Sequence, residues 1–92
     1  MFYEWDPAKA AANLHKHGVA FTEAATVFLD PLALTFHDPD HSVGEARSVT
    51  IGHSTAGQLL FVAHLDRDED FIRILSARPA TRRESHEYQE RR

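Results

Sequence analysis

Hydrophobic and polar residues change their spacing along this chain near residue 31. Before that point, residues 7–17 (PAKAAANLHKH) and 22–29 (TEAATVFL) place apolar side chains three or four positions apart, which is typical of amphipathic helices. After it, apolar residues alternate with polar ones or form short runs, which indicates strands. Four segments have this strand-like pattern: residues 32–37, 46–53, 58–65 and 71–77.

The first helix has signals for both of its ends. Residues 2–5 (FYEW) are rich in aromatic side chains and predict a short edge strand before it. Asp6 and Pro7 suit the N-cap and the first helical position, and Gly18 supplies the left-handed conformation that ends a helix. Three side chains of this helix are expected to face inward: Ala10, Ala11 and Leu14.

Similar signals bound the second helix. Thr22 can cap it, and Asp30-Pro31 stops it because the residue before a proline disfavours the helical conformation. Three of its side chains share one face: Ala24, Val27 and Phe28. This helix is therefore predicted to contribute to the core.

Turn residues separate the strands and lead into a last helix. Residues 54–57 (STAG) predict a hairpin and residues 67–70 (RDED) a second turn, while residues 38–44 form a polar loop. Thr81 to Glu84 matches a capping box, which predicts a polar helix over residues 82–91.

These elements predict one α+β domain that spans residues 1–92. Its order is β-α-α-β-β-β-β-α, with two N-terminal helices packed on one face of a small twisted antiparallel sheet and a C-terminal helix after the last strand. The other face of the sheet is expected to be partly open.

Composition narrows the class of protein. With 42% hydrophobic and 26% charged residues the chain is an ordinary globular one, and 92 residues leave room for only a shallow site. The lack of cysteine excludes disulfides and thiolate catalysis, and no apolar run approaches the roughly 20 residues of a membrane helix. We expect a cytoplasmic protein that does not enter membranes.

Charge is distributed unevenly along the chain. The net charge is −4, yet residues 73–83 (RILSARPATRR) contain four arginines and no acid. Eight of the ten basic residues are arginine, whose planar guanidinium binds phosphate with two parallel hydrogen bonds. Local charges decide affinity for a phosphate, because distant ones are screened beyond about 8 Å. The arginine-rich end therefore predicts binding to a phosphate-containing ligand.

Several side chains are candidates for that site. Arg73 is on a strand, Arg78 follows near its end, and Arg82 and Arg83 open the last helix, where backbone N–H groups also favour an anion. Pairing with nearby glutamates is an equal alternative for Arg82 and Arg83. Glu45 and Arg47 are two positions apart at the start of a strand: either Glu45 accepts a proton and Arg47 holds a phosphate or orients the carboxylate, or the two form a surface ion pair. Lys16 and His17 lie in the last turn of the first helix, which is accessible.

Seven histidines raise the possibility of a metal site. His15 and His17 face different ways on a helix, and no HExxH or cysteine-histidine pattern occurs. Residues 37–41 (HDPDH) are the one dense cluster of metal-ligand types, and a solvated turn explains them better. We predict neither a metal nor another cofactor.

Three segments together resemble the BrnT family of bacterial toxins, which pair with BrnA antitoxins. They are residues 2–21 (FYEWDPAKAAANLHKHGVAF), 44–47 (GEAR) and 73–88 (RILSARPATRRESHEY). The resemblance covers nearly the whole chain. It implies a RelE-like fold and a ribonuclease that inhibits translation by cutting RNA without a metal. It also implies a BrnA-like antitoxin with a ribbon-helix-helix region, through which alone the complex contacts operator DNA.

The same resemblance implies a set of active-site residues: Lys16, His17, Glu45, Arg47, Arg67, Arg73 and Arg78. Cutting RNA without a metal requires a base for the 2′-hydroxyl proton and cations for the pentacoordinate phosphate. We assign the base to Glu45 or His17 and the cationic clamp to Arg73 and Arg78. Three further residues would position the substrate: Lys16, Arg47 and Arg67.

Two other functions fit the sequence. An RNA-binding module without catalysis would bind RNA in a salt-sensitive manner and leave it intact. A protein-interaction domain would use its basic end and polar last helix to dock an acidic partner. The nuclease interpretation requires the arginines of the last strand and its following turn to converge on one phosphodiester.

Overall fold

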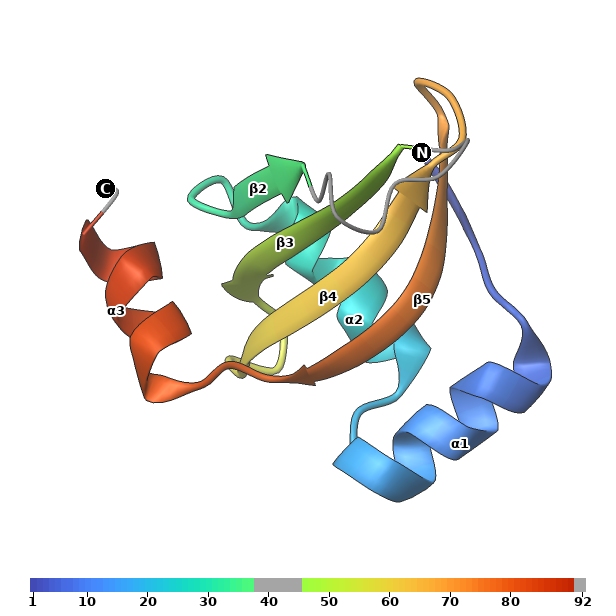
Figure 1. Ribbon diagram of the computed structural model, residues 1–92, viewed down its shortest axis with the longest axis horizontal. Helices are drawn as coiled ribbons and strands as arrows, with labels where there is room; N and C mark the ends of the chain where they lie inside the picture. Colours follow the sequence, from blue (N-terminus) through green and yellow to red (C-terminus); the bar gives the residue numbers. More distant parts are fainter. Residues whose placement is uncertain (38–45, 91–92) are drawn as a thin grey trace.

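The computed structural model describes residues 1–37 and 46–90 and confirms the predicted order of elements (Figure 1). The elements are β1 (Phe2–Glu4), α1 (Pro7–His17), α2 (Phe21–Ala25), the 3-10 helix η1 (Thr26–Leu29), β2 (Leu34–His37), β3 (Arg47–His53), β4 (Leu59–Asp66), β5 (Phe71–Pro79) and α3 (Arg82–Glu90). None of these helices is long and apolar enough to cross a membrane.

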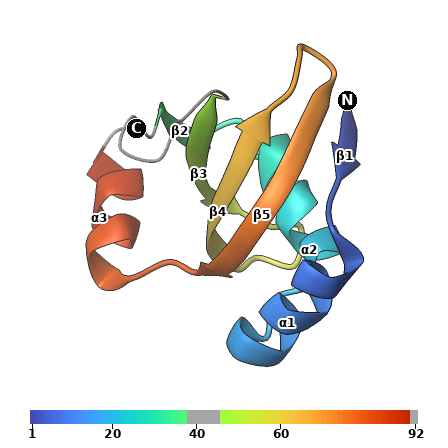
Figure 2. The ribbon, with the colours of Figure 1, turned by 45° about the vertical axis from the view of Figure 1, so that its right-hand side comes forward.

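The sheet has the strand order β1-β5-β4-β3-β2. The four strands from β2 to β5 form the predicted antiparallel meander, whereas β1 pairs with β5 in parallel. The sheet is therefore mixed, with the expected edge strand at β1. Helix α2 lies behind the sheet, while α1 and α3 lie on opposite sides of the molecule (Figures 1 and 2).

The core lies between the back face of the sheet and the segment from Val19 to η1. Leu60, Val62 and Ile74 of the central strands are at most 1% exposed and pack in one cluster with the helical side chains. The inward face predicted for the second helix is confirmed, since Ala24 and Val27 are fully buried and Phe28 packs against the cluster.

The face predicted for α1 is confirmed for Ala10, which packs against the core cluster, and wrong for Ala11 and Leu14. Leu14 is 51% exposed and Ala11 is exposed as well, whereas Asn13 is only 7% exposed. The Asn13 side chain donates to the carbonyl oxygens of Val19 (3.0 Å) and Ala77 (2.8 Å) and accepts from the Ala77 N–H (3.0 Å). Its carboxamide thus pairs with the exposed edge of β5 as a neighbouring strand would, so a polar group orients the helix.

The start of the second helix also differs from the prediction. The helix begins at Phe21 with Ala20 at the N-cap, and no side chain caps it, so Thr22 does not have the expected role. The N-cap thus lies two residues before Thr22, and the first helical residue, Phe21, is 2% exposed and packs edge-on against Trp5. After Ala25 the chain tightens into η1, which ends at Asp30 as expected.

A bulge changes which side chains of β5 share a face. Ser76 pairs with Ala63 and Ile74 with His64, so Leu75 has no partner on β4. An unpaired residue reverses the alternation of side chains beyond it. Strict alternation along β5 would place Ala77 on the same face as Arg73; because of the bulge, Ala77 instead faces the core, and Arg78 lies on the same face as Arg73.

Candidate functional site

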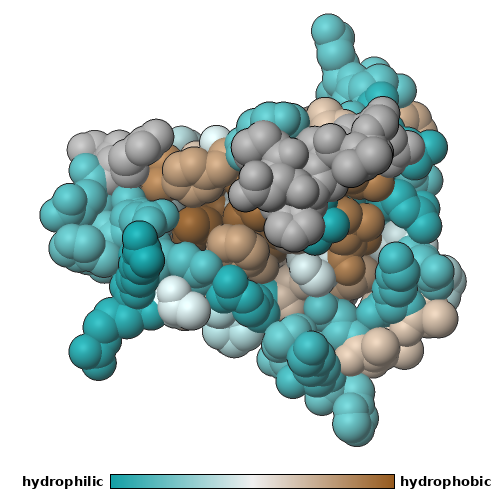
Figure 3. All heavy atoms as spheres, in the orientation of Figure 1, coloured by the Kyte–Doolittle hydropathy of each residue, from teal (hydrophilic) through white to brown (hydrophobic). Residues whose placement is uncertain are grey.

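The face of the sheet that α2 leaves uncovered carries the arginine side chains. Strand pairing places its residues on one side: Arg47, Val49 and Ile51 on β3, Phe61, Ala63 and Leu65 on β4, and Arg73, Ser76 and Arg78 on β5. We call this the open face. Figure 3 looks onto it and shows hydrophobic side chains gathered in the middle and toward α3, with hydrophilic residues around them.

Two arginines converge at the β1 side of the open face. The Arg73 Nη1 atom lies 3.8 Å and the Arg67 Nε atom 4.0 Å from the same atom, Oε1 of Glu4. Glu4 is in register with Arg73 across the parallel β1–β5 pair. Arg67 comes from the turn after β4, so guanidinium groups from two separate segments meet at one oxygen position.

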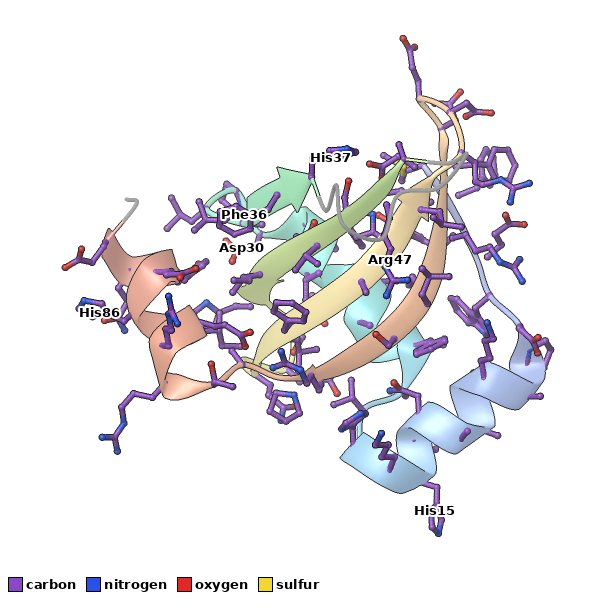
Figure 4. All side chains as sticks on the ribbon, in the orientation of Figure 1. His15, Asp30, Phe36, His37, Arg47 and His86 are labelled. Carbon is purple, nitrogen blue, oxygen red and sulfur yellow. The ribbon has the colours of Figure 1, made fainter. Side chains whose placement is uncertain are left out.

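Arg47 lies near this pair. Leu65 is in register with Arg47 on one side and with Arg73 on the other, so the two arginines are two strand spacings apart, about 10 Å, on the same face. Figure 4 labels Arg47 in front of β4, on the side of the sheet turned to the viewer. We refer to Arg47, Arg67 and Arg73 as the arginine cluster.

Arg78 is on the same face but has different partners. Its Nη1 and Nη2 atoms donate to the two carboxylate oxygens of Glu84 at 2.8 and 2.9 Å, and its guanidinium lies 4.1 Å from the centre of the Phe61 ring. The hydrogen bonds to Glu84 raise the pKa of Arg78, and those from Arg78 lower the pKa of Glu84 despite burial. Arg78 thus ties β5 to α3.

The predicted capping box at the start of α3 is confirmed. The Glu84 carboxylate accepts from the Thr81 N–H (2.9 Å), and the Thr81 hydroxyl accepts from the Glu84 N–H (3.2 Å). Arg82 and Arg83 open the helix with exposed side chains, and Arg83 approaches Glu87 at 3.8 Å. These two arginines follow Pro79 at the far end of β5 and do not join the arginine cluster.

Of the two predicted bases, only His17 lies within the described residues, and it is not brought to the arginine cluster. Glu45 lies outside the described residues. His17, with Lys16, ends α1 one turn after Asn13, whose side chain is bonded to Ala77. Arg73 is four residues before Ala77, which is roughly 13 Å along a strand. His17 therefore lies beside the other end of β5.

A groove of about 380 Å³ opens between the open face and α3. Its floor is apolar, with Phe36, Val49, Ile51 and Phe61, and its rim is polar, with His37, Thr81, Arg83, Glu84 and Glu87. Figure 4 shows Phe36 on the side of β2 next to α3. The groove is separate from the arginine cluster, whose members do not line it.

Two polar networks were not predicted from the sequence. Behind the sheet, His64 is 2% exposed; its Nδ1 atom lies 2.9 Å from Asp66 and its Nε2 atom 2.8 Å from the Thr50 hydroxyl. Burial lowers the pKa of His64 and outweighs the carboxylate of Asp66, which raises it. Because these side chains face away from the arginine cluster, we assign them a structural role.

The second network attaches α3 to the sheet. The buried Tyr88 hydroxyl donates to Asp30 (2.7 Å), which also accepts from the His53 N–H (2.9 Å). Burial by itself would raise the pKa of Asp30, but these hydrogen bonds and one from the Leu32 N–H lower it overall. Figure 4 shows Asp30 on the α3 side of the sheet.

Within residues 1–37 and 46–90, no three histidine or acidic side chains are grouped as metal ligands would be. Of the cluster at residues 37–41, His37 ends β2, and the other four residues lie outside the described part of the chain. His15, on α1, and His86, on α3, are both exposed (Figure 4).

The fold is similar to a solved one. The crystal structure of the ribonuclease toxin BrnT from Brucella abortus matches with a TM-score of 0.66 at 20% sequence identity, over 89% of this chain and 100% of that one. This match confirms the predicted α+β class, with which the RelE-like label is consistent. No curated protein sequence matches the chain.

A mixed sheet with an arginine-bearing open face, in a fold shared with this solved structure, defines a small α+β domain of the same fold class. Residues 5–84 match the family described as the ribonuclease toxin BrnT of type II toxin-antitoxin systems. The chain belongs to this family. Its expected class is thereby confirmed as a ribonuclease toxin, and the family implies an antitoxin as its partner.

Proposed function

We propose that this toxin cuts RNA on its open face without a metal, with the scissile phosphate held by Arg67 and Arg73. The observation that supports this most directly is the approach of both guanidinium groups to the same oxygen of Glu4. A phosphate oxygen about 1 Å closer to both guanidinium groups than this carboxylate oxygen would accept hydrogen bonds from two segments at once. Arg47 and Arg73 are about 10 Å apart across the sheet, so Arg47 lies close enough to contact an adjacent phosphate of the same RNA molecule.

The proposed chemistry is electrostatic. The 2′-hydroxyl oxygen attacks the neighbouring phosphorus, and negative charge builds up on the non-bridging oxygens of the pentacoordinate phosphate. Fixed cations stabilise that charge more than they stabilise the ground state, and this difference lowers the barrier. Arg67 and Arg73 take the clamp role because the guanidinium of Arg78 is already bonded to both oxygens of Glu84.

The partners follow from the same assignment. We propose a BrnA-like antitoxin with a ribbon-helix-helix region, which contacts operator DNA and covers the arginine cluster so that RNA is excluded. Both proteins and the RNA would meet in the cytoplasm. The rim of the groove beside α3, with two glutamates and one arginine, offers RNA less positive charge than the cluster does.

Replacement of Arg73 by alanine tests this function. Expression of the wild-type chain alone should stop growth and degrade cellular RNA, whereas Arg73→Ala should abolish both effects. Lys9→Ala removes an equal charge from an exposed position on α1 and should remain toxic. A folded Arg73→Ala protein that still stops growth and degrades RNA contradicts the proposal. Intact RNA in wild-type cells that have stopped growing would favour the non-catalytic binding module.

A further inference from the structure

Glu4 is placed on a rigid part of the open face. It ends β1, in register with Arg73 on β5, and its side chain is 38% exposed. The neighbouring aromatic pair Phe2–Phe71, with ring centres 5.2 Å apart, packs the same two strands together. The carboxylate is therefore held by strand pairing next to the arginine cluster while it stays open to a ligand.

The contacts of Glu4 with the arginines are loose. Its distances of 3.8 Å to Arg73 and 4.0 Å to Arg67 exceed the 2.7–3.2 Å of a hydrogen bond. The pair formed by Arg78 and Glu84, at 2.8 and 2.9 Å, shows what a fixed carboxylate looks like in the same protein. A ligand can enter between Glu4 and the two arginines without breaking a hydrogen bond to either.

Two other carboxylates near this end of the sheet, those of Asp66 and Asp68, have hydrogen-bond partners. Asp66 points to the back face, where it lies 2.9 Å from both His64 Nδ1 and Ser48 Oγ. Asp68 accepts hydrogen bonds from the N–H groups of Asp70 and Phe71 and so holds the turn before β5. Glu4 thus differs from both, because its carboxylate directly faces the arginines that would seat the phosphate.

We propose that Glu4 is the general base of RNA cleavage, an assignment that rests on the ribonuclease function proposed above. With a phosphodiester on Arg67 and Arg73, the 2′-oxygen of the preceding ribose, three bonds from the 3′-oxygen, would lie beside the Glu4 carboxylate. Glu4 takes the proton of the 2′-hydroxyl, and the 2′-oxygen forms a bond to phosphorus. The bond from phosphorus to the 5′-oxygen breaks, that oxygen takes a proton from water, and the resulting hydroxide takes the proton held on Glu4. The products are a 2′,3′-cyclic phosphate and a 5′-hydroxyl.

The role proposed for Glu4 predicts that binding and cleavage can be separated. A carboxylate that must accept the 2′-hydroxyl proton has no task on DNA, so DNA would bind at the same arginines and remain intact. Glu4 also repels the phosphate that it serves, and its removal should therefore not weaken binding. Loss of chemistry with retained binding is the result that a base predicts and that a phosphate ligand or a structural residue does not.

The experiment compares four purified variants of the 92-residue chain with the wild type on a short unstructured RNA. A copy with 2′-deoxyribose at every position measures binding without cleavage. Glu4→Gln should slow cleavage at least about 100-fold, the usual contribution of a general base, and bind the deoxy copy within about 3-fold of wild type. Glu69→Gln, with the same charge change in an exposed turn, should cleave as the wild type does. Arg73→Ala should weaken binding of the deoxy copy.

Two further readouts decide the assignment. The rate of the wild type should fall toward acid pH as the base is protonated, and Glu4→Gln should lose this limb of the profile of kcat/KM against pH. A Glu4→Gln protein with the wild-type rate, or with a rate lowered only as far as binding is lowered, overturns the role of Glu4. Glu45→Gln tests the other predicted base. If that variant alone lost the fall in kcat/KM toward acid pH, the role of Glu4 would also be overturned. A wild-type protein that leaves RNA intact instead refutes the underlying ribonuclease function.

Discussion

Asn13 offers a direct test of how α1 is attached to the sheet. Its side chain makes three hydrogen bonds while only 7% exposed, two as a donor to the carbonyl oxygens of Val19 and Ala77. Asn13→Asp keeps the size of the side chain but replaces the donating amide by an oxygen. Each of the two buried carbonyls left without its donor costs about 1–3 kcal/mol, so we expect a loss of about 2–6 kcal/mol in the free energy of unfolding at pH 7. That is a large part of the roughly 5–15 kcal/mol of a typical domain.

The sign of the pH dependence makes this prediction stricter. Two carbonyl oxygens and burial would raise the pKa of an aspartate at position 13 in the folded state above its unfolded value. The folded variant then binds the extra proton, and its stability falls as pH rises through that interval. The difference from wild type should therefore be larger at pH 7 than at pH 4, because a protonated carboxyl group can still donate one hydrogen bond.

Urea unfolding followed by circular dichroism measures this difference, with an unchanged slope as the condition for comparing midpoints. Ala12→Asp is the matched control, since it adds the same charge at the preceding, exposed position of α1 and should change stability by no more than about 0.5 kcal/mol. If Asn13→Asp were no less stable than Ala12→Asp, the three hydrogen bonds would not hold α1 on β5.

Three other changes probe the remaining contacts. The lowered pKa of His64 means that the unfolded chain binds more protons, so stability should fall as pH drops below about 6.5, and His64→Gln should flatten this part of a urea midpoint series. Glu84→Gln removes the charged partner of Arg78; because the pair is partly exposed, we expect a loss of about 1 kcal/mol in urea unfolding at pH 7. The pKa of Glu84 is lowered in the folded state, so this loss should be smaller at pH 3 than at pH 7, and an equal loss at both would contradict the assignment. Gly52→Ala brings a methyl group to 3.2 Å from the Val27 carbonyl oxygen, and thermal unfolding should report about 1–3 kcal/mol of destabilisation; an unchanged midpoint would mean that η1 yields freely.

The order of elements could be predicted because each has a local cause. Alternating apolar residues gave the strands, and the left-handed Gly18 (φ 71°) and Gly57 (φ 84°) end a helix and shape a hairpin as expected. The capping box of Thr81 and Glu84 likewise depends on residues three positions apart. Such signals are readable because both partners lie within one turn of the chain.

Contacts between distant segments could not be predicted in the same way. Asn13 is buried because Ala77, 64 residues later, offers an unpaired edge, and a helical period alone assigns that position to Leu14 or Ala11. The parallel pairing of β1 with β5 brings Glu4 to Arg73, and nothing in the local sequence specifies it. The candidate arginines were identified from charge, but which of them is already paired depends on Glu84 and Glu4.

The unpaired Leu75 makes β5 behave as two half-strands of opposite phase. Deletion of this one residue would restore strict alternation and leave Ile74, Ala77 and Arg78 on their present faces. An insertion elsewhere in β5 would instead turn over everything on one side of it, so that either Arg78 would point into the core or Ala77 and Ile74 would leave it. Such insertions within β5 should therefore be far less tolerated than the same changes in the hairpin at residues 54–57. When β5 is aligned with other chains, counting odd and even positions will mislead unless this extra residue is allowed for.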